Sequence, residues 1–301
     1  MSDAMHHQVP IDTHTRLVGL LGQPLGHSLS PAMHNRAFHT RGLNFCYLPI
    51  ELADEDLAAV TAGIARMNFA GYNVTIPHKI RIMEYLDAVD PLARAIGAVN
   101  TVTLKNGRAT GYNTDGIGFV HSLEADEGVS VRGKTVLLLG CGGAARAIAM
   151  TLAQQGAGRI VLSNRTESKA HALAEDVSRL GRARCHAIPL HATAMETALG
   201  DTDILVNTTS VGMQPREERM PIETRLLHGG LVVCDIVYNP ARTCLLAAAE
   251  KQGCRVVGGI GMLVYQGAAA FRMWTGQAAP IGAMFAALGQ GPRDPLNHPA
   301  P

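Results

Sequence analysis

The amino-acid sequence predicts an α/β protein built from two domains, and three observations support this prediction. Short apolar runs that suit β-strands alternate with amphipathic helical patterns along almost the whole chain, an order typical of mainly parallel sheets covered by helices. The 301 residues, 47% of them hydrophobic, suffice for about two domains that each bury a core. A glycine-rich turn between a strand and a helix, VLLLGCGGAARAIA, lies at 136–149 rather than near the start of the chain.

The region before this turn carries its own alternation of strands and helices. Ser30 followed by Pro31 predicts the N-cap and first residue of a helix, which Gly42 would end. Asn106-Gly107 between two alternating runs predicts a β-hairpin, because this dipeptide favours a type I′ turn. The other predicted elements are strands at 17–22, 45–50, 71–77, 99–104 and 108–113 and an amphipathic helix at 54–67.

A helix begins near Asp115, and we place the boundary between the domains there. Beyond it, the strand that opens at about residue 136 is followed by strands near 159–163, 185–188, 203–207 and 231–236. A final helical stretch at 262–274 is expected to return to the first domain. We therefore predict a first domain of residues 1–115, completed by 262–301, and a second domain of residues 116–261.

Charge and composition exclude several classes of protein. Lys plus Arg number 26 and Asp plus Glu 25, with no basic stripe, so we expect no nucleic-acid partner. No apolar run approaches the roughly 20 residues that span a membrane. The amino terminus lacks the apolar core of a secretory signal, so we expect a cytoplasmic protein.

Metal binding is not expected either. The six cysteines form no C-x-x-C pair, which supports neither a zinc site nor a disulfide framework. His6, His7 and His14 lie in a segment that we predict to be a flexible tail, and we predict the same for residues 290–301.

Gly140, Gly142 and Ala145 fit the pattern G-x-G-x-x-A between a strand and a helix. The first glycine permits a tight turn, the second lets backbone N–H groups approach a pyrophosphate, and the small third residue lets the helix pack closely on its strand. The positive end of the helix dipole adds to the attraction for phosphate. The pattern predicts a Rossmann-like, dinucleotide-binding second domain.

The next strand indicates which dinucleotide is bound. It ends in Ser163-Asn164-Arg165-Thr166, where an NAD-binding domain would place an acidic residue. A guanidinium at this position would pair with the 2′-phosphate of NADP, whereas a carboxylate would repel it. The alternative is that Arg165 is a solvated loop residue and that Thr166 caps the next helix. We expect NADP(H) as the cofactor.

A second group of motifs precedes the glycine-rich turn, namely GHSLSP (26–31), NVTIPHK (73–79), GAVNT (97–101) and YNTDG (112–116). They offer hydroxyls, amides, one carboxylate and one amine at strand ends and a helix start, where α/β proteins collect ligand groups. This set suits a small polyhydroxylated ligand. Ser28 and Ser30 would hold a carboxylate, and Lys79 and Asp115 would form an acid–base pair. Taken singly, each of these residues also has a purely structural explanation as a cap, turn or surface residue.

Together the motifs strongly resemble the shikimate dehydrogenase family over about residues 17–287. They are, in order, GQPLGHSLSPAMHN, GYNVTIPHK, GAVNT, GYNTDGIGF, GCGGAAR, SNRT, NTTSVGM, VYNP and GIGMLVYQG. The resemblance implies an amino-terminal α/β substrate domain and a Rossmann-like NADP-binding domain. It also implies the NADPH-dependent reduction of 3-dehydroshikimate to shikimate in aromatic amino-acid biosynthesis, by a monomer or homodimer.

The resemblance further implies roles for single residues. Lys79 would be the catalytic acid/base, oriented by Asp115. The substrate carboxylate would be bound by Ser28, Ser30 and Tyr238, and the ring hydroxyls by Thr75, Asn100, Asp115 and Gln266. The cofactor would be bound by Gly140, Gly142, Gly143 and Ala144 at the pyrophosphate, by Asn164, Arg165 and Thr166 at the adenosine phosphate, and by Ile236, Gly259 and Met262 at the nicotinamide. For Tyr238, Ile236 and Met262, packing alone is an alternative.

Two other functions fit the same scaffold. One is a quinate/shikimate dehydrogenase that uses NAD or NADP, and the other is a non-catalytic NADP-binding sensor. The presence of both Lys79 and Asp115 argues against the sensor. Two features depart from the family pattern: Cys244 stands where proline is common, and the loop at 212–221 is long and charged, which suggests a lid. Both departures leave the choice of substrate open.

Overall fold

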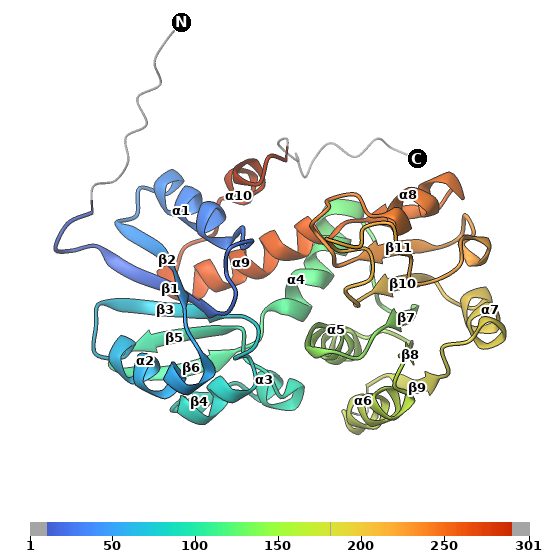
Figure 1. The fold of residues 1–301 in the computed structure, drawn as a ribbon, viewed down its shortest axis with the longest axis horizontal. Helices are drawn as coiled ribbons and strands as arrows, with labels where there is room; N and C mark the ends of the chain where they lie inside the picture. Colours follow the sequence, from blue (N-terminus) through green and yellow to red (C-terminus); the bar gives the residue numbers. More distant parts are fainter. Residues whose placement is uncertain (1–10, 181, 291–301) are drawn as a thin grey trace, which may run out of the picture. The chain divides into compact units, whose positions relative to one another are not determined.

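The computed structural model describes residues 11–180 and 182–290. The predicted flexible ends, including His6, His7 and residues 291–301, lie outside the described residues. Contacts divide the chain into two compact units (Figure 1): unit 1 falls within residues 1–114 and 267–301, and unit 2 within residues 115–266. Each unit contains one six-stranded sheet covered by helices.

The sheet of unit 1 is mixed, with the strand order β2-β1-β3-β5-β6-β4. Its strands are β1 (Arg16–Gly22), β2 (Phe45–Glu51), β3 (Phe69–Val74), β4 (Ala88–Val89), β5 (Thr101–Lys105) and β6 (Arg108–Tyr112). The β1–β2, β1–β3 and β4–β6 pairs are parallel, and the other two are antiparallel. Asn106 (φ 53°) and Gly107 (φ 73°) both have positive φ between β5 and β6, which confirms the predicted hairpin with its type I′ turn.

Helices cover both faces of this sheet. The first face is covered by α1 (Ser30–Thr40), α10 (Ile281–Ala287) and residues 267–275 of α9 (Gly259–Thr275), where Phe38 and Phe271 stack with ring centroids 5.2 Å apart. The indole N–H of Trp274 donates a hydrogen bond of 3.0 Å to the carbonyl of Val102. The second face is covered by α2 (Leu57–Ile64), η2 (Arg81–Tyr85) and α3 (Pro91–Ile96), whose apolar residues share one core with the strands.

Two predictions about helices in unit 1 were wrong in detail. The helix expected at 54–67 is a 3-10 turn, η1 (Asp54–Asp56), followed by α2, because Asp54 turns its side chain to other partners described below. Ser30 is the first residue of α1, the N-cap is Leu29, and no side chain caps this end. Ser30 is buried in the first turn of the helix instead. Gly42 follows the end of α1 with φ 62°, as the sequence predicts.

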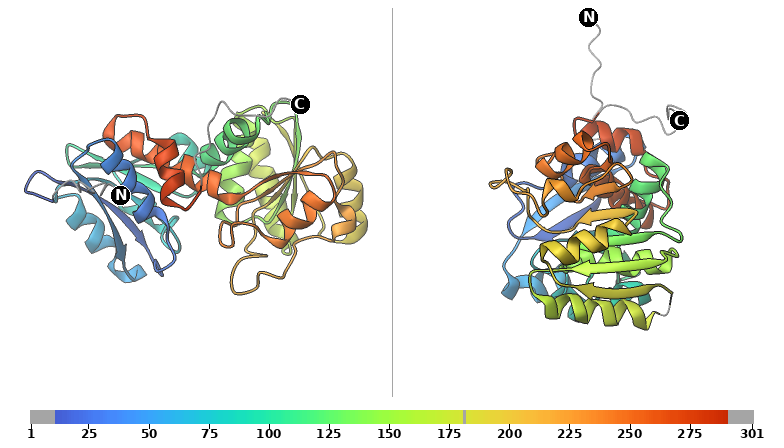
Figure 2. Two further views of the ribbon diagram at one scale, coloured as in Figure 1. Left: turned by 90° about the horizontal axis from the view of Figure 1, so that it is seen from above. Right: turned by 90° about the vertical axis from the view of Figure 1, so that its right-hand side faces the viewer.

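The sheet of unit 2 is entirely parallel, with the strand order β12-β11-β10-β7-β8-β9. Its strands are β7 (Thr135–Leu139), β8 (Arg159–Ser163), β9 (Arg184–Ile188), β10 (Ile204–Asn207), β11 (Val232–Asp235) and β12 (Arg255–Val257). The right view of Figure 2 shows the green-to-orange strands side by side. The chain runs outward from β7 through β8 to β9 on one side of the sheet, and then returns to β10 on the other side of β7. This strand order confirms the Rossmann-like topology.

The helical elements of unit 2 are α4 (Asp115–His121), η3 (Ser122–Asp126), α5 (Gly143–Gln154), α6 (Glu167–Arg179), α7 (Ala192–Gly200), η4 (Thr224–Leu226), α8 (Cys244–Lys251) and the first residues of α9. In Figure 1, α5 and α6 lie next to each other beside β7 and β8, in agreement with their contacts. On the other face of the sheet, α7 and α8 share one core with β7, β10 and β11. The strands are therefore buried on both faces, and their polar residues concentrate at the ends.

No helix formed by the described residues is long and apolar enough to span a bilayer. Over residues 11–180 and 182–290, no three His, Cys, Asp or Glu side chains are grouped so that they could hold a metal ion.

Candidate functional site

Ser28 and Ser30 lie at the start of α1, directly after the loop that follows β1. The backbone N–H of Ser30 donates to the hydroxyl of Ser28 at 3.3 Å, and the N–H of Ser28 donates to the carbonyl of Leu25 at 2.9 Å. Ser28 is partly exposed, whereas Ser30 is 9% exposed. The two hydroxyls are thus held by one turn at the amino end of a helix, an arrangement that suits a bound carboxylate.

A buried chain of hydrogen bonds runs from Tyr47 toward Asn100. The Tyr47 hydroxyl donates to Oδ1 of Asn73 at 2.8 Å. The Nδ2 of Asn73 donates to the carbonyl of Asn100 and to Oγ1 of Thr101, both at 3.0 Å. A carbonyl can only accept, so the orientation of the Asn73 amide is fixed and Tyr47 must donate to it.

Asn100 is also held from the other side. Its Oδ1 accepts from the backbone N–H of Thr114 at 2.8 Å, and its Nδ2 donates to Oγ1 of Thr114 at 3.0 Å. Asn100 is 3% exposed and Thr114 2% exposed, so these bonds are shielded from water. Asp115, which begins α4 with 7% of its surface exposed, follows Thr114 directly.

Thr75 and Lys79 lie in the turn that follows β3. Thr75 comes one residue after the end of β3, and its N–H donates to the carbonyl of Leu21 at 2.8 Å. The N–H of His78 donates to the carbonyl of Thr75 at 2.9 Å, and the carbonyl of Lys79 accepts from the N–H of Val99 at 2.8 Å. The turn therefore ties the backbone of Lys79 to the strand region that also presents Asn100.

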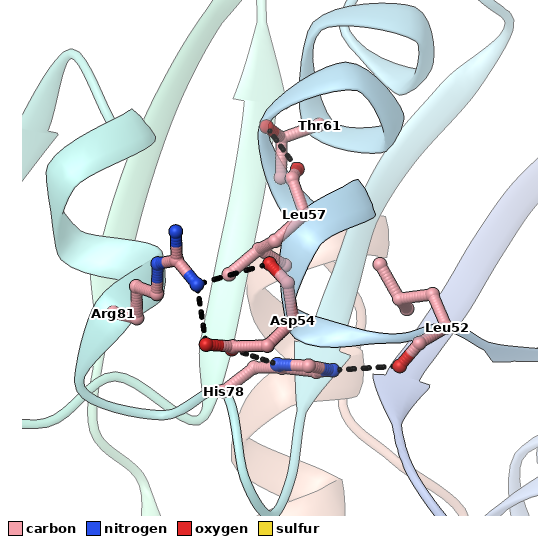
Figure 3. Close-up of polar contacts among 6 residues, drawn as sticks. All are labelled: Leu52, Asp54, Leu57, Thr61, His78 and Arg81. Atoms are coloured by element: carbon pink, nitrogen blue, oxygen red, sulfur yellow. Dashed lines mark hydrogen bonds and ion pairs between the residues drawn. The ribbon is translucent and has the colours of Figure 1, made fainter.

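The side chain next to Lys79 anchors the same turn to the end of β2 (Figure 3). The ring of His78 is fully buried, its Nδ1 lies 3.0 Å from Oδ1 of Asp54, and its Nε2 lies 3.0 Å from the carbonyl of Leu52. Both partners can only accept, so both ring nitrogens donate when the two bonds are made. Arg81 pairs with the same carboxylate, and together with His78 it lowers the pKa of Asp54.

The glycine-rich turn in unit 2 has the backbone that the sequence predicts. Gly140 has φ 99°, and a Cβ there would lie 2.9 Å from Oγ1 of Thr208 and from Cγ2 of Thr209, so no other residue fits. Gly142 and Gly143 stand at the start of α5, where added Cβ atoms would meet no atom within 4 Å. Ala144 follows them in the first turn of α5. The space beside these two residues at the start of α5 is therefore open, which suits a bound pyrophosphate.

The loop after β8 carries Asn164, Arg165 and Thr166. Thr166 occupies the N-cap position of α6, yet its side chain makes no capping bond, so the alternative role of this hydroxyl as a cap is not realised. The Nδ2 of Asn164 donates to the carbonyl of Thr166 at 2.9 Å and holds the loop. Arg165 is exposed between them.

Ile236 and Gly259 are in close contact within unit 2. A Cβ on Gly259 would lie 2.4 Å from the carbonyl oxygen of Ile236, so the start of α9 approaches the end of β11 as closely as its backbone allows. Tyr238 is half-buried, and burial raises the pKa of its phenol. Met262 and Gln266 lie on α9, and a Cβ on Gly118 of α4 would lie 2.7 Å from the Cβ of Gln266.

The structure thus assigns Ser28, Ser30, Thr75, Lys79 and Asn100 to unit 1, and assigns to unit 2 Asp115, Tyr238, Gln266, Gly140, Gly142, Gly143, Ala144, Asn164, Arg165, Thr166, Ile236, Gly259 and Met262. Sequence reasoning missed Tyr47 and Asn73, which lie in the hydrogen-bond chain that leads to the predicted residue Asn100. Asn73 opens the motif NVTIPHK, and Tyr47 is the single hydroxyl in the apolar run FCYLPI. A polar side chain inside an apolar strand is the sequence feature that could have identified both residues, because a buried polar group needs a hydrogen-bond partner.

The comparisons with known proteins cover both units. The sequence matches the family models described as Shikimate dehydrogenase substrate binding domain over residues 20–102, Shikimate / quinate 5-dehydrogenase over residues 123–236, and Shikimate 5'-dehydrogenase C-terminal domain over residues 259–288. A curated protein of Methanopyrus kandleri, Shikimate dehydrogenase (NADP(+)), is 47% identical over 281 residues, which cover 93% of this chain and 97% of that protein.

Solved structures agree with the sequence comparison. A crystal structure of a shikimate dehydrogenase in complex with NADP+ superposes with a TM-score of 0.87 at 41% identity, covering 93% of this chain and 96% of the other. A structure of shikimate 5-dehydrogenase from Listeria monocytogenes in complex with shikimate and NAD has a TM-score of 0.89 at 37% identity, covering 92% of this chain and 98% of the other.

Proposed function

The chain belongs to the shikimate dehydrogenase family, and from this premise we propose that it catalyses the reversible, NADPH-dependent reduction of 3-dehydroshikimate to shikimate. The observation that carries this proposal is the 47% identity to an NADP-dependent shikimate dehydrogenase over 93% of the chain, which includes both units. The activity is that of an oxidoreductase in the biosynthesis of aromatic amino acids.

We propose that unit 1 supplies most of the substrate-binding groups. Ser28 and Ser30, assisted by Tyr238, bind the carboxylate, and the ring hydroxyls are bound by Thr75, Asn100, Asp115 and Gln266. The buried bonds that fix Asn73, Asn100 and Thr114 support this assignment, since preorganised polar groups recognise hydroxyls with little loss of entropy.

Unit 2 has the features that NADP(H) needs. The open amino terminus of α5 behind Gly142, Gly143 and Ala144, and the positive φ of Gly140, suit a pyrophosphate. Exposed Arg165, with Asn164 and Thr166, is available for the adenosine phosphate. The close packing of Gly259 on Ile236, with Met262 one turn further along α9, suits a flat apolar ring such as nicotinamide.

Lys79 acts as the acid/base in this proposal. The bound cofactor supplies the hydride that reduces the ring carbonyl, and the ammonium of Lys79 gives its proton to the oxygen that becomes the hydroxyl. In the reverse direction Lys79 takes this proton back. Asp115 keeps the ammonium oriented, and the anchored turn around His78 restricts the position of Lys79.

The remaining assignments are less specific. The family resemblance suits a monomer or a homodimer. The six cysteines are unpaired, as is usual in a reducing compartment, and this supports a cytoplasmic location. A quinate/shikimate dehydrogenase that uses NAD or NADP is the second candidate, because the model matched at 123–236 describes both activities. A non-catalytic NADP-binding sensor is the third, and turnover would exclude it.

Steady-state kinetics with shikimate and with quinate, each with NADP and NAD, test the proposal. We expect the highest kcat/KM with shikimate and NADP. Lys79→Ala should lower kcat about 10²–10⁴-fold with a much smaller change in KM for shikimate. Lys105→Ala is the matched control, since this exposed lysine lies on β5 in the same unit, and it should leave kcat unchanged. Equal or better oxidation of quinate would transfer the assignment to the second candidate.

A further inference from the structure

A buried carboxylate at the end of β11 has no role in the reaction described so far. Asp235 is 1% exposed, and three hydrogen bonds converge on it. Its Oδ1 accepts from Nδ2 of Asn207 and from the backbone N–H of Val237, both at 3.0 Å. Its Oδ2 accepts from the hydroxyl of Thr243 at 2.7 Å. Every neighbour that bonds to this carboxylate through these contacts is a donor.

The orientation of Asn207 shows that this pattern of donors is fixed. Its Oδ1 accepts from the backbone N–H of Thr209 at 3.1 Å and from the hydroxyl of Thr209 at 2.7 Å, while its Nδ2 donates to the carbonyl of Val211 at 3.1 Å. A backbone N–H only donates and a carbonyl only accepts, so the amide cannot be turned round. Nδ2 must therefore donate to the side chain at position 235, which has to offer an acceptor atom there.

Asp235 joins two segments that carry motifs of the proposed site. Val237 and Thr243 lie near the two ends of residues 236–243, so one carboxylate fixes this segment at both ends. Tyr238 lies inside the segment, next to Val237. Through Asn207, the same carboxylate is linked to residues 208–211, which begin at Thr208, and the hydroxyl of Thr208 donates to the carbonyl of Leu139 at 2.7 Å beside the glycine-rich turn.

We propose that Asp235 is a positioning residue for the substrate: by fixing segment 236–243 at Val237 and Thr243, it presents Tyr238 to the substrate carboxylate. The inference deepens the proposed function and rests on it. Asp235 itself touches neither substrate nor cofactor in this account, and it acts through Tyr238.

Asp235→Asn tests the proposal with almost no change in volume. The Oδ1 of the new amide can still accept from Asn207 and Val237, but Nδ2 takes the place of Oδ2. The hydroxyl of Thr243 then loses its charged acceptor, and this end of the segment is held more weakly. We expect KM for shikimate to rise about tenfold, with kcat and KM for NADP changed less than about threefold. Asp203→Asn is the matched control. Its carboxylate accepts from the N–H of Thr135 at 2.8 Å just before β10, at the opposite end of the same sheet, and its loss should leave KM for shikimate unchanged.

A double-mutant cycle with Tyr238→Phe separates positioning from general damage. If Asp235 acts through Tyr238, then Asp235→Asn raises KM less than about twofold further once the phenol hydroxyl is gone. If Asp235 only stabilises the fold, the two increases multiply, and that result overturns the proposal. Should Asp235→Asn fail to fold, Thr243→Val removes one of the three bonds and should show the same non-additivity with a smaller increase in KM.

The outcomes distinguish this inference from the function on which it rests. An active wild-type protein whose KM for shikimate is unaffected by Asp235→Asn contradicts the positioning role alone. A wild-type protein without turnover of shikimate and NADP contradicts the proposed function and the positioning role together.

Discussion

Replacing Asp235 by Asn should change how the free energy of unfolding varies with pH. Burial raises the pKa of the Asp235 carboxyl from 3.8 to about 6, although the bonds donated by Thr243, Val237 and Asn207 act in the opposite direction. In the unfolded chain the carboxyl is solvated and regains its ordinary pKa. Between these two values the folded protein therefore binds a proton more tightly than the unfolded chain does.

The sign and the size follow from this difference. A carboxyl with a raised pKa in the folded state contributes stability that is fully present below pH 3.8 and is lost as the pH rises through about 6. The interval from 3.8 to about 6 corresponds to roughly 3 kcal/mol, since one pKa unit is about 1.36 kcal/mol. Arg81 and His78 lower the pKa of Asp54, whose contribution therefore changes in the opposite direction. Such contributions are common to wild type and variant and cancel in their difference.

Urea denaturation of both proteins at pH about 4, about 5 and about 7 measures this difference. The free energy of unfolding of the wild type, minus that of Asp235→Asn, should fall by about 2–3 kcal/mol from the lowest to the highest pH. Similar m-values for the two proteins at each pH are the control for comparable unfolding transitions. Parallel pH profiles would refute the reasoning, because they would mean that the buried carboxyl titrates alike in the folded and unfolded states.

Three further predictions follow from single contacts. Ser30→Ala should raise KM for shikimate about 10- to 150-fold, and a substrate analogue without the carboxylate should be unaffected; equal losses for both ligands would exclude the carboxylate role. Arg165→Ala should raise KM for NADP about tenfold with little change for NAD, and the effect should shrink as salt is added; a wild type that uses both cofactors equally would contradict this interpretation of the loop. Gly259→Ala should lower the free energy of unfolding by more than about 2 kcal/mol, because the added Cβ would lie 2.4 Å from the carbonyl oxygen of Ile236. Chemical denaturation measures this loss. An alanine variant as stable as the wild type would show that α9 can move away from Ile236.

Local chemistry made several elements predictable from the sequence. Asn106-Gly107 specifies its own turn because both residues tolerate positive φ, and the structure has positive φ at both. Gly140 is required by its φ of 99° and by the approach of Thr208 and Thr209, and the pattern G-x-G-x-x-A already indicated the turn. Apolar runs located the strands, although β3 begins at Phe69 and ends at Val74, where 71–77 was predicted.

Contacts between distant segments decided the rest. Ser30 has the residue type and the following proline of an N-cap, yet Leu29 is the N-cap and Ser30 is buried as the first residue of α1. The predicted helix at 54–67 starts late because Asp54 pairs with His78 and Arg81 from beyond β3. A local pattern cannot reveal such partners. A polar group that folding buries bonds to a segment that the fold places beside it, and that segment can be distant in the sequence.

By itself, the sequence determined the α/β class, the family, the chemical types at the proposed site and the glycine-rich turn, because these depend on residues close together along the chain. Only the tertiary structure decided which buried groups support them. Tyr47 and Asn73, which lead to Asn100, and Asp235 between Asn207 and Thr243, are placed by strands that become neighbours only in the folded sheets. The direction of each hydrogen bond, and with it the need for an amide or a carboxylate at each position, follows from those neighbours.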